Sequence, residues 1–86
     1  MKEQASPELR AAMLEVVDNQ LRELTPPETK ETYDRLVASG ISDNEARRLI
    51  AVALSTEIFE MMKYKKEYSS ERYIASLRKL PKLPWE

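Results

Sequence analysis

One stretch in the middle of the chain, residues 42–64, constrains the fold more than any other. It is the longest run with helical character, and its centre, residues 49–54 (LIAVAL), is apolar on every face. A helix that is apolar all round has to be surrounded by other elements. We therefore expect a long central helix over residues 43–64, with the other helices packed about it.

The rest of the chain favours helices as well. The one glycine and the five prolines fall where helices would begin or end, and helix-forming residues dominate elsewhere. A chain of 86 residues can bury one modest core. We expect a single, compact, all-α four-helix domain, with residues 1–5 frayed and helices at about 7–24, 26–39, 43–64 and 70–80.

Capping signals set two of the expected boundaries. Gly40 stands where a left-handed residue can end a helix, and Ser42 and Glu45 have the spacing of a capping box for the next one. Thr25 and Glu28 have the same spacing, with a proline at the first helical position. Both pairs therefore predict the start of a helix.

The C-terminal tail, residues 80–86, cannot continue the last helix because it contains Pro81 and Pro84. It also carries Leu83 and Trp85, the only tryptophan. We expect an extended tail that folds back and packs on the long central helix.

The absence of histidine and cysteine excludes several kinds of site. The chain can have no cysteine nucleophile, no histidine base and no Cys/His zinc site, and it contains no Gly-rich phosphate loop. We expect no enzymatic activity, no metal and no cofactor. Neither a signal peptide nor an apolar run long enough to span a membrane is evident, so we expect a cytoplasmic protein without membrane contact.

Glu57 is the one acidic residue that falls on the apolar side of the central helix. A carboxylate there could act as a general acid or base. The alternative is a buried acid that pairs with a cation such as Arg72, or with a tyrosine hydroxyl, and holds two helices in register. We favour this structural interpretation.

The first helix carries the residues that we expect to bind a partner. Its apolar side chains recur at spacings of three and four, which predicts an amphipathic helix. Such a stripe could lie on a helix of a partner protein or on a second copy of the chain, or it could pack on its own domain. We predict a small, non-enzymatic protein-interaction module that could self-associate through Leu9, Met13, Val16, Val17, Leu21 and Leu24.

The alternative function is a nucleic-acid-binding regulator, which we consider less favoured. Residues 1–45 hold 5 basic and 10 acidic side chains, a net charge of −5, whereas residues 46–86 hold 9 and 5, a net charge of +4. A basic face could meet an acidic partner, or the arginines could form salt bridges to acids of the first two helices. The candidate basic patch comprises Arg47, Arg48, Lys63, Lys65 and Lys66.

A series of short pieces over residues 26–85 resembles a small family of uncharacterised bacterial all-helical domains. The pieces are Pro-Pro-Glu at residue 26, Tyr-x-x-Leu-x-x-x-Gly at 33, Glu-Ala-x-x-Leu-Ile-Ala at 45, Glu-Ile at 57 and Arg-Tyr-x-x-x-Leu-x-x-Leu-Pro at 72. The resemblance implies a short stand-alone member of a family of unknown function. It implies no activity, and no functional residues transfer from it.

Overall fold

A computed structural model describes residues 7–86, and this part of the chain contains helices and no strand. The four helices are α1 (Pro7–Glu23), α2 (Pro27–Ala38), α3 (Asp43–Tyr64) and α4 (Ser70–Lys79). The expected all-α four-helix domain is confirmed. The predicted fraying of residues 1–5 lies outside the described residues. None of the helices within residues 7–86 is long and apolar enough to cross a membrane.

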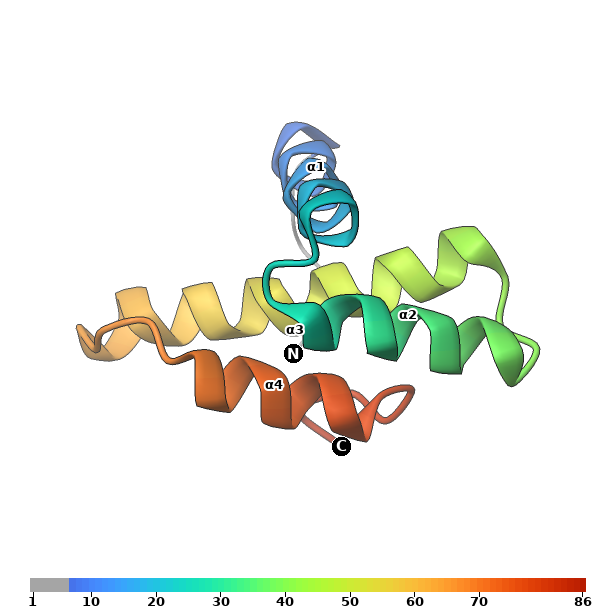
Figure 1. The fold of residues 1–86 in the computed structure, drawn as a ribbon. Coiled ribbons are helices and arrows are strands. Elements are labelled where there is room, and N and C mark those ends of the chain that lie inside the picture. The colour runs from blue at the N-terminus through green and yellow to red at the C-terminus, as the bar shows by residue number, and fades with distance from the viewer. Residues whose placement is uncertain (1–6) are drawn as a thin grey trace.

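The helices are arranged around α3. In Figure 1, α2, α3 and α4 lie alongside one another, whereas α1 lies across them and is seen nearly end-on. α3 contacts each of the other three helices, and α2 also contacts α1 and α4. The long helix is therefore central, as its apolar middle predicts.

The core is built on the middle of α3. Five of the six residues in the LIAVAL segment are buried, and only Val52 is partly exposed. Small side chains at Ala46, Ala51 and Ala53 allow the neighbouring helices to approach α3 closely. The other helices complete the core with Val17, Leu36, Tyr73, Leu77 and Leu80.

The connection from α2 to α3 follows the predicted capping pattern. Gly40 has φ of +101°, the Gly40 amide donates to the Val37 carbonyl, and the Ile41 amide donates to the Leu36 carbonyl. These two bonds form a Schellman motif. The hydroxyl of Ser42 then accepts a 3.2 Å hydrogen bond from the Glu45 amide, so the predicted N-cap is confirmed.

The start of α2 differs from its prediction. The N-cap is Pro26, which makes no side-chain cap, and Pro27 occupies the first helical position. The Thr25 hydroxyl donates instead to the Glu23 carbonyl, at 3.1 Å. The predicted capping box of Thr25 and Glu28 is therefore wrong, because two successive prolines move the helix start one residue beyond the position that Thr25 could cap.

Two other helix ends use left-handed residues that are not glycine. Leu24 follows α1 with φ of +56°, and Lys65 follows α3 with φ of +54°. Side chains with a Cβ are disfavoured in this conformation. Both residues are exposed, so neither side chain compensates for this cost by packing in the core.

A buried polar cluster joins α4 to the first two helices. The Tyr73 hydroxyl donates a 2.7 Å hydrogen bond to the Gln20 side-chain oxygen, which also accepts a 2.8 Å bond from the Thr29 hydroxyl. Tyr73 and Thr29 are completely buried. Within residues 7–86, no Cα atom of α1 lies within 8 Å of one in α4, so side chains alone link these helices.

Arg35 of α2 holds the C-terminal end of α4. Its guanidinium donates to the Leu80 carbonyl at 2.7 Å and to the Leu77 carbonyl at 2.9 Å. The last carbonyls of a helix lack partners within the helix and carry partial negative charge. A cation from a neighbouring helix therefore satisfies the end of α4.

The C-terminal tail packs against the helices but is not extended. Leu83 packs on the core, whereas Trp85 is 44% exposed. The Lys82 amide donates to the Lys79 carbonyl and the Glu86 amide donates to the Leu83 carbonyl, so the tail forms two turns. Pro84 stands second in the latter turn, where the fixed φ of proline is favoured.

Candidate functional site

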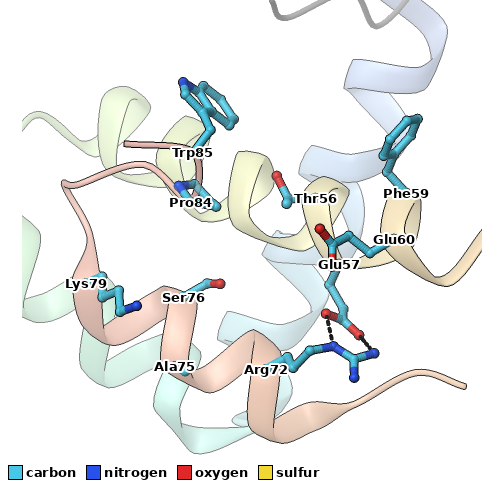
Figure 2. Close-up of a pocket in the computed structure, with 10 residues that line it drawn as sticks. All are labelled: Thr56, Glu57, Phe59, Glu60, Arg72, Ala75, Ser76, Lys79, Pro84 and Trp85. Carbon is cyan, nitrogen blue, oxygen red and sulfur yellow. Dashed lines mark hydrogen bonds and ion pairs between the residues drawn. The ribbon is translucent and has the colours of Figure 1, made fainter. Parts of the chain in front are cut away.

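An open groove lies between α3 and α4 and the C-terminal tail. Its volume is about 440 Å³, and Pro84 and Trp85 of the tail form part of its lining. Figure 2 shows Trp85 and Phe59 on either side of the groove, with Thr56 between them. The lining residues are Thr56, Glu57, Phe59, Glu60, Arg72, Ala75, Ser76, Lys79, Pro84 and Trp85.

An ion pair between Glu57 and Arg72 forms part of the lining of the groove. Arg72 donates to the two Glu57 oxygens at 3.1 and 2.8 Å, and the Ser69 amide donates to one of them at 3.1 Å. Glu57 is 5% exposed. The hydrogen bonds with Glu57 raise the pKa of the Arg72 guanidinium, so this side chain keeps its charge.

This ion pair follows from the way α4 begins. The Ser69 hydroxyl accepts from the Arg72 amide at 3.2 Å and caps the helix. The same turn thereby directs both the Ser69 amide and the Arg72 side chain toward α3. Glu57 is thus the buried, paired acid that the structural interpretation expected, and its oxygens are already hydrogen-bonded.

The rims of the groove are aromatic and half exposed. Phe59 is 48% exposed and Trp85 is 44% exposed. The polar groups between them include the Thr56 hydroxyl, which donates to the Val52 carbonyl within its own helix. No group of His, Cys, Asp or Glu side chains within the described part of the chain could hold a metal ion.

The end of α3 extends this exposed surface. Every residue from 62 to 68 is exposed, and Met62 is 74% exposed. The Lys63 amine lies 6.0 Å from the centre of the Phe59 ring and 5.3 Å from that of Tyr64. The Lys66 amine lies 5.4 Å from the Tyr64 ring. These distances permit cation–π contacts between the lysines and the rings.

The arginines of the predicted basic patch are used in ion pairs. Arg47 contacts Asp18 of α1 at 2.7 Å and Asp43 at 3.0 Å. The hydrogen bond to Asp18 and, to a smaller extent, the one to Asp43 raise the pKa of Arg47. Arg48 pairs with Glu45 at 2.8 Å. Arg47 thus forms the salt bridge to the first helix that the structural alternative expected.

The five cations of that patch do not lie together. Arg48 and Lys63 are separated by four turns of α3, roughly 22 Å at 1.5 Å per residue. Lys63, Lys65 and Lys66 occupy the far end and make no ion pair with any of residues 7–86. The structure therefore contains two separate basic positions instead of one patch.

The predicted partner-binding stripe on α1 is also divided. Val17 is completely buried, and Met13 and Leu21 pack against the core. These three residues anchor α1 on its own domain. Leu9, Val16 and Leu24 are exposed, so the core buries only one part of the stripe.

Comparison with known proteins adds no family. No protein-family model, curated protein or solved structure matches this chain. The resemblance of residues 26–85 to a family of bacterial helical domains stays a prediction.

Sequence reasoning did not find the groove. Phe59 falls off the apolar side of α3 that contains Ile50 and Leu54, and a large aromatic residue at an outward position is the signal that could have pointed to it. The position of Trp85 across the groove from Phe59 depends on the turns of the tail, which no spacing within the sequence indicates. The Gln20 amide was a visible signal of a buried polar cluster, because it interrupts the apolar stripe of α1.

Proposed function

We propose that this chain is a small protein-interaction module without enzymatic activity, and that the groove between α3 and α4 receives a segment of a partner protein. The observation that carries the proposal is the pair of half-exposed aromatic side chains, Phe59 and Trp85, on either side of the groove. Large apolar side chains that stay exposed around a concavity are typical of interaction sites.

The pairing of the charged groups in the lining supports a binding role over a catalytic one. Glu57 and Arg72 bind each other, and the Ser69 amide contributes a further bond. A general acid or base needs a carboxylate that can reach a substrate. Since the Glu57 oxygens are held by three hydrogen bonds, the ion pair fixes these two side chains in the lining of the groove.

The division of the cations between two ends of α3 weighs against the nucleic-acid alternative. Binding along a phosphate backbone requires cations that follow one continuous surface. Arg47 and Arg48 are instead committed to neighbouring acids. The cytoplasmic location expected from the sequence is retained as part of the proposal.

Site-specific photo-crosslinking in cells tests this function. A benzophenone amino acid replaces Phe59 in one variant and Val37, an exposed residue on α2, in a control variant. We expect a protein adduct from position 59 that is absent at position 37 and is lost when Trp85→Ala is added. The same products from both positions, or none from position 59, would reject the groove as an interaction site.

A further inference from the structure

The outward side of α1 combines exposed apolar groups with unpaired acids. Leu9, Ala12 and Val16 are exposed and recur at spacings of three and four, so they share one face of the helix. Glu8 and Glu15 border this face, being one turn before and after Ala12. Neither acid makes an ion pair with any of residues 7–86. We call these five residues the acidic strip.

The end of α3 has the complementary character. Phe59, Met62 and Lys63 share one face, because they are spaced by three and four residues. Phe59 and Met62 are 48% and 74% exposed. Lys63 and Lys66 lie over aromatic rings and have no acidic partner among residues 7–86. We call these four residues the basic end.

We propose that the partner is a second copy of this chain, whose acidic strip docks on the basic end of the first. This inference rests on the proposed function, since Phe59 belongs both to the groove and to the basic end. Exposed apolar side chains of the two surfaces would cover each other, and Glu8 and Glu15 would meet Lys63 and Lys66. Unpaired charges of opposite sign beside two apolar surfaces are the complementarity that an interface requires.

A second copy fits better than an unrelated partner because one chain carries both surfaces. α1 crosses α3, and the last turns of α3 continue past the crossing (Figure 1). A two-fold axis that places one acidic strip on a basic end also places the second strip on the second end. The arrangement thus makes two equivalent contacts and closes as a dimer. It also uses the opposite net charges of the two halves of the sequence, −5 and +4.

Sedimentation analysis of charge-reversal variants tests the dimer. The variants are Lys63→Glu with Lys66→Glu, Glu8→Lys with Glu15→Lys, and all four changes combined. A matched control, Arg78→Glu with Lys82→Glu, reverses two exposed cations outside both surfaces. Circular dichroism verifies that every variant is folded.

We expect the native chain to dimerise in a concentration-dependent manner. Each double reversal should weaken association about tenfold or more, because like charges then face each other. The fourfold variant should recover the native affinity, and the control should leave it unchanged. Raising the salt concentration should weaken the native dimer, since exposed charge pairs are screened.

Two results would overturn the inference. One is a native chain that stays monomeric up to about 1 mM, a concentration at which even weak association is measurable. The other is a dimer that does not respond to the reversals. If either is found while position 59 still cross-links to a different protein, the interaction module stands and only the identity of its partner is wrong. A monomer that yields no adduct at position 59 rejects both proposals.

Discussion

Tyr73 and Gln20 are 53 residues apart in the sequence, and their side chains meet in a 2.7 Å hydrogen bond that links α4 to α1. The Tyr73 ring is completely buried, and burial raises the pKa of its hydroxyl to about 12 from the usual 10. The first and last helices of the sequence are thus linked through the Tyr73 hydroxyl, which must stay protonated to donate this bond.

Alkaline pH should weaken the protein through Tyr73. The unfolded chain loses the Tyr73 proton near pH 10 and the folded chain near pH 12, so its contribution to stability is complete below pH 10 and is lost as the pH rises toward 12. The Tyr73→Phe variant should be less stable than the native protein by about 1–2 kcal/mol at pH 8, because a buried hydrogen bond is missing.

Urea unfolding of both proteins at pH 8, 10 and 11 measures this difference. We expect the two free energies of unfolding to converge as the pH rises, since only the native chain releases the Tyr73 proton on unfolding. A difference that stays constant across this range would show that the hydroxyl titrates normally in the folded protein.

Removing the charge of Glu57 should loosen the start of α4. In Glu57→Gln, the Arg72 guanidinium loses its ionic partner, and we expect a loss of about 2 kcal/mol in the free energy of unfolding. Glu60→Gln, one turn along the same helix, is the matched control and should cost less than about 0.5 kcal/mol. Equal effects of the two changes would indicate that the buried ion pair adds no stability.

Replacing Arg35 should fray the end of α4. Arg35→Met keeps much of the side-chain volume but removes both hydrogen bonds to the Leu77 and Leu80 carbonyls. We expect a loss of about 1–2 kcal/mol and faster hydrogen exchange in the last turn of α4. Arg78→Met, which alters an exposed arginine in that same turn, should leave the exchange rates almost unchanged.

Glycine at the two left-handed positions should stabilise the protein. Lys65→Gly and Leu24→Gly remove a Cβ where φ is +54° and +56°. The relief of that steric cost exceeds the extra freedom that glycine gives the unfolded chain, so each change should add about 0.5–1 kcal/mol. Thermal unfolding can measure the gain, with Lys66→Gly as a control that should not be stabilising.

The sequence predicted the helices well because local signals define them. The all-round apolar segment at residues 49–54 placed α3 at the centre, and Gly40 with Ser42 defined the turn before it. Glu57 stood out as an acid on an apolar face, and Arg72 was correctly considered as its partner. Apart from the pairing with Arg72 of α4, each of these signals lies within one helix or its caps.

The features that sequence reasoning missed depend on how distant helices meet. Arg35 reaches the end of α4 across more than 40 residues of chain, and nothing near Arg35 marks it as a capping residue. The apolar stripe correctly predicted which face of α1 packs on the domain. The sequence could not show that Val17 is buried whereas Val16 is exposed at the edge of that face. The groove likewise requires the turns of the tail to bring Trp85 near α3.

The position of α4 in the sequence has a consequence for synthesis of the protein. Tyr73, Leu77 and Leu80 complete a core that Val17, Leu36 and Ile50 begin, so a nascent chain that ends before α4 exposes an unfinished apolar surface. It also leaves the Gln20 amide without the Tyr73 hydroxyl. Chains grow from the N-terminus, and long-range contacts form late. We therefore expect productive folding to wait for α4, so a ribosome that stalls before the codons for α4 would hold an aggregation-prone chain.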